Sequence, residues 1–289
     1  MTAPAPADAL TVGLVQLCVS DDPAQNLPQT QALIAEAAAG DARLVLTPEC
    51  TNLIAQNPDW QADVVRTEAD DATLRALREQ AAGLGIWLLI GSLALRREAE
   101  TAGDGDARLV NRSLLIAADG RIAARYDKIH MFDVTISDSE SYCESRSYRP
   151  GTRAVLAQGP VPMGLSICYD LRFPHLYRAL AQAGAQVLTV RSAFNDTTGA
   201  AHWHTLLRAR AIETGCFVLA PAQTGRHEAL HGGGGRRSFG HSLAASPWGE
   251  VLLDMGDSPG VGIITLDLPA VARSRSRIPS LTDQAFEMP

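Results

Sequence analysis

The sequence predicts an α/β fold in which helices cover a mixed β-sheet. Apolar runs of strand length alternate with helical segments along most of the 289-residue chain. Asp119 and Gly120 separate two apolar runs and predict a hairpin, which a purely parallel, doubly wound sheet would lack. With a hydrophobic content of 46%, the chain has enough apolar material for one large core.

The first half of the chain is expected to alternate strands and helices before the hairpin. The run at 87–95, WLLIGSLAL, has no polar alternation and predicts a strand buried on both faces. The two hairpin strands are expected at 109–117 and 122–126. The other elements predicted here are strands at 11–19 and 44–47 and helices at about 26–39 and 72–84.

The second half of the chain is expected to continue this alternation and to end in a strand-rich part. A strand should end at Ile167, and a helix should begin near Pro174 and end at Gly184. The segment HGGGGRRSFG at 231–240 predicts a mobile loop. The other elements predicted here are a helix at 203–215 and strands at 186–190, 217–220, 242–245, 251–253 and 261–266.

Composition limits the domain organisation and the partners. We expect a disordered leader at 1–9, a single domain at 10–270 and a C-terminal tail at 271–289 that takes part in oligomer contacts. The leader lacks the pattern of a signal peptide or membrane span. The net charge of −7 argues against nucleic acid or an anionic membrane as a partner. Five cysteines without CxxC pairing argue against a disulfide framework or a zinc site and favour the cytoplasm.

Cys168 lies where an apolar run stops and the chain turns toward a helix, in GLSICYDLRFP. A sulfur at such a turn can lie near backbone NH groups and the positive end of a helix, which favours the thiolate. A free cysteine is also often just a small buried apolar residue. The local sequence therefore leaves both a catalytic and a packing interpretation open.

Two charged residues occupy comparable positions. Glu49 ends the apolar run LVLTPEC, and Lys128 follows a hairpin strand among Tyr126, Ile129 and Met131. Taken singly, they could be a capping carboxylate and a lysine whose stem covers apolar surface. Taken together with Cys168, a carboxylate and an ammonium complete a set for acyl transfer.

The segments TPEC, YDKIHMFD and GLSICYDLRFP resemble, in order and spacing, three motifs of the nitrilase superfamily of carbon-nitrogen hydrolases. The likeness extends from about Thr11 to Leu268. The segments CYDLRFPHLYRALAQAGAQVLT and SAFNDTTGAAHWHTLLRARAIETGCFV are most similar to the amidase branch that includes deaminated-glutathione amidase and ω-amidase. The resemblance implies a four-layer α-β-β-α sandwich, no cofactor or metal, and a homodimer or larger even-numbered homo-oligomer.

The same resemblance implies a role for each candidate residue. Cys168 would attack an amide carbonyl, and Glu49 would pass the thiol proton to ammonia and later activate water against the thioester. Lys128 would hold the oxyanion, and Glu144 of the CES segment would help to position Lys128 and the substrate. The remaining candidates, for the oxyanion hole and for substrate binding, are Tyr169 through its backbone NH, Arg172, Phe194 and Thr198.

The expected function is therefore a cysteine-dependent amidase that releases ammonia from a small carboxylate-bearing amide, of the deaminated-glutathione amidase type. Alternatives within the superfamily are an ω-amidase acting on 2-oxoglutaramate, a nitrilase and an N-carbamoyl amidohydrolase. A catalytically silent binding protein on the same fold is the alternative from another class. A Cys-His hydrolase that uses His130 as its base is a further alternative, although we expect His130 to be structural.

Several neighbouring residues are expected to be structural. Asp170 should lock the turn after Cys168, and Arg172 is either a buried ion-pair partner, which we favour, or a clamp on a substrate carboxylate. His202 and His204 should start a helix beside the pocket, because no cysteine or carboxylate completes a metal site around them. The cysteines expected to be packing residues or bystanders are Cys18, Cys50, Cys143 and Cys216. The run TISDSESYC and the glycines at 232–235 depart from the family pattern and should border the substrate.

Overall fold

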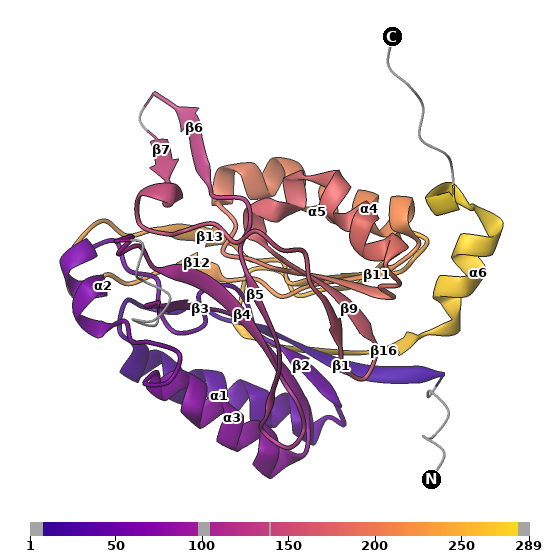
Figure 1. Cartoon of the computed structure of the whole chain (residues 1–289), viewed down its shortest axis with the longest axis horizontal. Coiled ribbons are helices and arrows are strands. Elements are labelled where there is room, and N and C mark those ends of the chain that lie inside the picture. Colours follow the sequence, from indigo (N-terminus) through magenta and orange to yellow (C-terminus); the bar gives the residue numbers. More distant parts are fainter. Residues whose placement is uncertain (1–7, 98–104, 139, 283–289) are drawn as a thin grey trace.

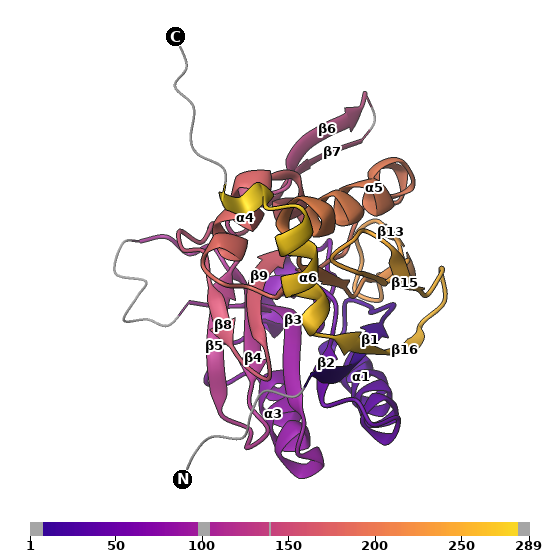
Figure 2. The same ribbon diagram turned by 90° about the vertical axis from the view of Figure 1, so that its right-hand side faces the viewer.

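The computed structural model describes residues 8–97, 105–138 and 140–282. Two six-stranded sheets lie face to face, and helices cover the outer face of each sheet (Figures 1 and 2). The layers follow the order helix, sheet, sheet, helix. The four-layer α-β-β-α sandwich implied by the sequence is thus confirmed.

The first sheet carries the Glu49 and Lys128 segments, and α1 (Pro23–Ala39) and α3 (Ala72–Leu84) cover its outer face. Its strands, in spatial order, are β16 (Gly260–Asp267), β1 (Ala9–Gln16), β2 (Leu44–Leu46), β3 (Trp87–Leu95), β4 (Val110–Ile116) and β5 (Ile122–Asp127). Strand β2 pairs in parallel with β1 and with β3, and the other pairs are antiparallel. The sheet is therefore mixed, as predicted.

The second sheet carries the Cys168 segment, and α4 (Pro174–Gln182) and α5 (Asp196–Thr214) cover its outer face. Its strands, in spatial order, are β15 (Val251–Asp254), β14 (Leu243–Ala245), β11 (Phe217–Ala220), β10 (Val187–Arg191), β9 (Pro162–Ile167) and β8 (Leu156–Gln158). Strand β10 pairs in parallel with β9 and β11. The two sheets thus repeat one arrangement, with parallel strands at the centre and antiparallel strands at the edges.

The remaining elements lie at the ends and edges of the sandwich. They are α2 (Pro58–Val64), β6 (Asp133–Ser137), β7 (Glu140–Cys143), η1 (Glu144–Arg146), η2 (Cys168–Arg172), β12 (Thr224–Arg226), β13 (Arg237–Phe239), α6 (Pro269–Arg277) and η3 (Ser280–Thr282). Strands β6 and β7 form a hairpin that stands out from the body beside the amino end of α5 (Figures 1 and 2).

The alternation of side chains along β2 shows how the two cores form. Leu44 and Leu46 belong to the core between the sheets, whereas Val45 packs on the other face with Ile34 of α1 and Leu77 of α3. All three β2 side chains are fully buried. Because both faces are covered, this strand is apolar throughout, and each such side chain contributes roughly 1.5–3 kcal/mol by leaving water.

Local capping explains why α3 has the bounds predicted for it. The Asp71 side chain accepts a hydrogen bond from the NH of Leu74 at 2.7 Å, and Gly85 ends the helix with a φ of 65°. Helix α5 begins at Asp196 rather than near residue 203, because the Asn195 side chain caps it by accepting from the NH of Thr198 at 3.0 Å. His202 and His204 therefore lie inside this helix rather than at its start.

Three further predictions need correction. The segment 231–240 is not wholly a loop, because Arg237–Phe239 forms β13 and pairs with β12. The first strand already includes Ala9, which we assigned to the leader; residues 1–7 lie outside the described residues. Helix α6 crosses the expected boundary at residue 270, and Arg275 fixes it to the body by donating to the carbonyls of Ala185 and Thr214.

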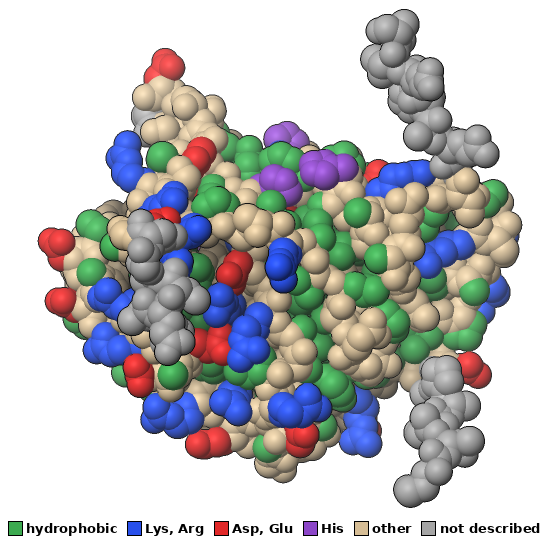
Figure 3. Space-filling model, in the orientation of Figure 1, with side chains coloured by type: hydrophobic (Ala, Val, Ile, Leu, Met, Phe, Trp, Pro, Cys, Tyr) green, Lys and Arg blue, Asp and Glu red, His purple; other side chains and the backbone are tan. Residues whose placement is uncertain are grey.

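Charged side chains of both signs occur on the face of the molecule that Figure 3 presents. Figure 3 shows Lys and Arg interspersed with Asp and Glu over the face that it presents. None of the helices in the described ranges combines the length and the hydropathy that a membrane span needs.

Candidate active site

The segments predicted to carry the chemistry meet in one cavity of about 230 Å³ between the two sheets. Glu49 follows β2 and Cys168 follows β9, so both lie at carboxyl ends of parallel strands, where functional residues gather in α/β folds. Lys128 follows β5 and Glu144 begins η1. All four predicted residues line this cavity, although they are up to 119 positions apart in the chain.

Lys128 is buried between two carboxylates. Its Nζ lies 3.0 Å from Oε1 of Glu49 and 2.8 Å from Oε2 of Glu144. Burial alone would lower the pKa of Lys128, but the charges of Glu144 and Glu49 outweigh it and raise the pKa well above its ordinary value. The ammonium is therefore charged at neutral pH, which an oxyanion donor requires.

Glu49 is held as a carboxylate by several donors. Burial raises the pKa of Glu49, but Lys128 and the backbone NH of Ala193, 2.8 Å from Oε2, outweigh it and lower the pKa below the ordinary value. Asn111 also donates to Oε1 at 2.9 Å. Glu49 is thus ionised and able to accept a proton.

The Cys168 thiol, in contrast, is neutral in this site. Burial, the charge of Glu49 and a hydrogen bond to it raise the pKa of Cys168 well above its ordinary value, although Lys128 lowers it. The turn alone could favour a thiolate, but a buried carboxylate faces the sulfur, and a neutral thiol is the form from which Glu49 was expected to take the proton. A neutral thiol beside an ionised Glu49 instead requires the base to take the proton as the sulfur attacks.

The backbone at Cys168 is strained and locked by Asp170. Cys168 has a φ of 50°, a left-handed conformation that costs a residue with a side chain about 1–2 kcal/mol. The buried Asp170 carboxylate accepts from the NH of Ile167 at 2.8 Å and from the hydroxyl of Tyr126 at 2.6 Å. Asp170 thus lies where we expected the residue that locks this turn.

His130 contacts the Asp170 side chain that fixes this turn. Its Nδ1 is 2.7 Å from Asp170, and its ring stacks on Phe173 with centroids 3.6 Å apart. It does not line the cavity that contains Cys168. The geometry therefore gives the Cys-His alternative no support.

The residues suggested for substrate binding divide into two groups. Tyr169, Phe194 and Thr198 line the cavity, whereas Arg172 does not. The Arg172 guanidinium lies 5.3 Å from the ring centre of Phe194 and 3.3 Å from Nδ1 of His202, and no carboxylate of the described residues pairs with it. Arg172 thus lies outside the cavity, as the structural role that we favoured over a substrate clamp requires, but it contacts aromatic rings and has no ion-pair partner among the described residues.

Arg236 and two cysteines line the cavity although none of them was assigned to the site from the sequence. Cys50 and Cys143, expected to be bystanders, line the cavity; burial and the charge of Glu49 raise the pKa of Cys50. Arg236 lines it as well, and its Nη2 donates to the carbonyl of Ala193. Its position follows a run of glycines, where helical or strand periodicity gives no indication of side-chain direction.

Three buried polar atoms of the cavity lining lack a hydrogen-bonding partner among the described residues. They are Nε of Arg236, Oγ1 of Thr198 and Oδ1 of Asn111. A buried polar atom without a partner costs roughly 1–3 kcal/mol, so such atoms are suited to a ligand that satisfies them. One cationic donor, a hydroxyl and an amide oxygen that belong to residues of the cavity lining are thus left without a partner among the described residues.

Of the two segments expected to border the substrate, TISDSESYC contributes to the cavity lining through Tyr142 and Cys143, whereas none of the glycines at 232–235 lines it. Tyr142, Cys143 and Glu144, at the end of β7 and after it, line one side, and Arg236, which follows the glycines, lines another. Asn195 at the start of α5 donates to Glu140 of the hairpin at 2.6 Å. The β6–β7 hairpin is therefore tied to the second sheet across the cavity.

Known proteins resemble this chain over most of its length. The family model described as carbon-nitrogen hydrolase matches residues 11–276. The chain is 36% identical over 277 residues to the deaminated glutathione amidase of Yersinia enterocolitica, covering 95% of this chain and 93% of that protein.

Two solved structures show the same fold. The NitFhit protein of C. elegans matches with a TM-score of 0.86 and 34% identity, over 96% of this chain and 65% of that longer chain. Nit3 of Saccharomyces cerevisiae, a member of branch 10 of the nitrilase superfamily, matches with a TM-score of 0.79 and 28% identity, over 96% of both chains.

Proposed function

The chain belongs to the carbon-nitrogen hydrolase family of the nitrilase superfamily, and we propose that it is an amidase that releases ammonia through a thioester on Cys168. One observation carries the proposal. A neutral buried thiol, an ionised carboxylate and a charged lysine line the same cavity. These are the nucleophile, base and oxyanion donor that acyl transfer requires.

The first half-reaction forms the thioester. The Cys168 sulfur attacks the amide carbonyl while its proton passes to Glu49, and the carbonyl oxygen becomes an oxyanion beside Lys128. Collapse of this intermediate breaks the C–N bond. Glu49 returns the proton to the departing nitrogen, which leaves as ammonia.

The second half-reaction releases the acid. Glu49, again ionised, takes a proton from water as the water attacks the thioester carbonyl, and the resulting oxyanion is again held by Lys128. Collapse breaks the C–S bond, and the proton returns to the sulfur. Glu144 keeps Lys128 charged and positioned through both steps, since two of its oxygens lie within 3.0 Å of Nζ.

We propose that the substrate bears a carboxylate bound by Arg236. Glu49, Glu144 and Lys128 together carry a net charge of −1, and these three residues alone would repel an anionic substrate. Arg236 offsets this charge, and its Nε has no hydrogen-bonding partner among the described residues of the protein. The relative from Yersinia enterocolitica is named as an amidase of deaminated glutathione, which supports this substrate class. An ω-amide such as 2-oxoglutaramate has the same two groups and is the second candidate.

The protein is further proposed to act in the cytoplasm as a homodimer or larger even-numbered homo-oligomer. Three exposed apolar side chains support assembly. They are Ile212 of α5, Trp248 in the turn before β15, and Leu252 of β15, with exposed fractions of 51%, 43% and 42%. Sedimentation of the purified chain would measure the number of subunits.

Ammonia release tests the chemistry and the substrate together. The wild type and Cys168→Ala would be compared on deaminated glutathione, 2-oxoglutaramate, an N-carbamoyl amino acid and a simple nitrile. We expect turnover of the carboxylate-bearing amides by the wild type and none by the variant. Turnover of nitriles alone would refute the amidase proposal, and equal turnover by Cys168→Ala would refute the nucleophile.

A further inference from the structure

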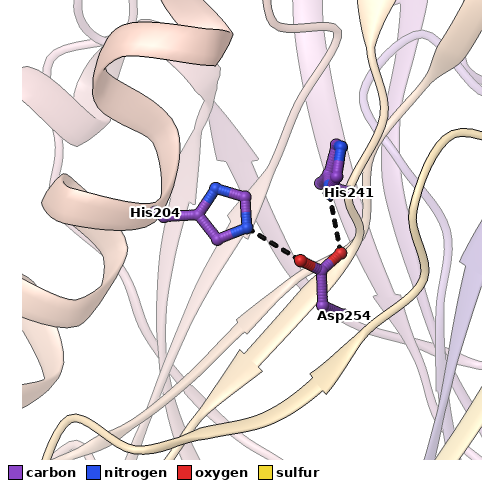
Figure 4. Close-up of side chains that lie close together, drawn as sticks. All are labelled: His204, His241 and Asp254. Atoms are coloured by element: carbon purple, nitrogen blue, oxygen red, sulfur yellow. Dashed lines mark hydrogen bonds and ion pairs between the residues drawn. The ribbon is translucent and has the colours of Figure 1, made fainter.

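A cluster of metal-ligating side chains lies outside the active-site cavity. His204 on α5, His241 between β13 and β14, and Asp254 at the end of β15 converge at the surface (Figure 4). Nε2 of His204 lies 2.8 Å from Oδ2 of Asp254, and Nδ1 of His241 lies 2.8 Å from Oδ1. The three ligand atoms all lie within 4.8 Å of one another.

From the sequence we expected no cysteine or carboxylate to complete a metal site around His202 and His204. That expectation is wrong, because Asp254 is 50 positions away in sequence and reaches His204 only through the fold. We propose that this cluster binds a divalent transition-metal ion with zinc-like ligand preferences. The proposal is independent of the amidase function, since none of the three residues lines the catalytic cavity.

The backbone and the neighbouring rings hold His241 in place. His241 has a φ of 55°, its NH donates to Gly256 at 2.6 Å, and its carbonyl accepts from Nε1 of Trp203 at 2.8 Å. The imidazole stacks on Phe239 with ring centroids 4.5 Å apart. Because these contacts fix the ring, ligation would require little further ordering.

Asp254 is held in a similar way, and the cluster is open to water. Oδ1 of Asp254 also accepts from the NH of Gly256 at 3.0 Å. The side chains of His204, His241 and Asp254 are exposed by 37%, 30% and 31%, so a hydrated ion can reach all three. The free positions of the ion would then be filled by water.

The donor set selects the class of metal. Two imidazole nitrogens and one carboxylate oxygen suit zinc, cobalt, nickel or copper, whereas Ca²⁺ and Mg²⁺ prefer ligand sets made of oxygen. Binding requires each coordinating nitrogen to give up its proton. Nδ1 of His204 and Nε2 of His241, which have no partner among the described residues, can carry the remaining ring protons.

A bound ion would connect elements that also shape the active site. Helix α5, which carries His204, begins two residues before Thr198, and His241 closely follows β13, which begins directly after Arg236. Because only the folded chain brings these three elements together, the ion would bind the folded state and stabilise it. We expect the melting temperature to rise with zinc and the catalytic rate to change little.

Metal titration tests this proposal in the full chain. Cys168→Ala serves as the parent protein, because it removes the active-site thiol as a competing ligand. Zinc binding would be followed by calorimetry and by melting temperature, and cobalt binding by absorption. We expect one equivalent to bind the parent, with a cobalt spectrum that lacks a thiolate charge-transfer band.

Variants locate the bound ion. Asp254→Asn and His204→Gln, each on this parent, should weaken zinc binding at least roughly tenfold, because each removes one of three ligands. His202→Gln, two residues away on the same helix, should bind as the parent does. The proposal is overturned if the parent binds no zinc, if both ligand variants bind as tightly as the parent, or if cobalt shows thiolate ligation. Circular dichroism identifies a misfolded variant, and the other ligand variant then decides.

Discussion

Replacement of Arg236 by glutamine should remove the preference of the enzyme for substrates that bear a carboxylate. A hydrogen bond to a charged group contributes about 1.5–3 kcal/mol. Since 1.36 kcal/mol corresponds to a factor of ten, the loss in kcat/KM should be about 10- to 150-fold. The unsatisfied Nε of Arg236 in the cavity lining is the structural basis of this magnitude.

The assay compares ammonia release from a carboxylate-bearing amide and from its methyl ester. Arg236 also donates to the carbonyl of Ala193, whose NH binds Glu49, so a general disturbance of the site would slow both substrates equally. The ratio of the two kcat/KM values removes that effect. Arg237→Gln is the matched control, because the neighbouring Arg237 is exposed and pairs with Asp196. An unchanged ratio in Arg236→Gln would refute the assignment.

Three further predictions concern the catalytic residues and their support. Glu144→Gln should lower kcat about 10²- to 10³-fold, the loss typical of a missing oxyanion donor, because Glu144 holds the donor Lys128 in place. The alkaline limb of the pH profile should also move to lower pH, because burial lowers the pKa of Lys128 once the charge of Glu144 is gone. Since the pKa of Glu49 is depressed, its contribution to stability is present above the unfolded pKa of about 4.3 and is lost as pH falls through the lower folded pKa, which urea unfolding at acid pH would show. The acid limb of the kcat/KM profile should fall at that folded pKa, below the ordinary value of a glutamate. Tyr126→Phe removes a 2.6 Å hydrogen bond to buried Asp170 and should lower the free energy of unfolding in urea by about 1.5–3 kcal/mol; an unchanged value would show that this bond is not needed.

The strands and helices could be predicted wherever local pattern and tertiary environment agree. The β3 strand at Trp87–Leu95 and α3 at Ala72–Leu84 have the expected bounds, because one is apolar throughout and the other has a cap at each end. The β6–β7 hairpin and α2 were not predicted. Its strands are only five and four residues long and no residue in them is fully buried, so the alternation of burial along them leaves a weak pattern in the sequence.

The candidate site could be predicted only in part for a related reason. Motifs in sequence order identified Glu49, Lys128 and Cys168, which the structure brings to one cavity. The turn around Cys168 could not by itself decide the charge state of the thiol, because that state depends on the distance to a carboxylate from the other sheet. Arg236 and Asp254 were not assigned to a site, because their neighbours come from distant segments and no local pattern specifies which way their side chains point.

The central claim is that Cys168 forms a thioester with the substrate. Its direct test is intact-protein mass spectrometry after rapid acid quenching of the enzyme during turnover of a carboxylate-bearing amide. We predict an adduct with the mass of the substrate minus ammonia, located by peptide mapping on Cys168 and missing in Cys168→Ala. Rapid turnover by Cys168→Ala, or an adduct on a different residue such as Cys50, would contradict the account.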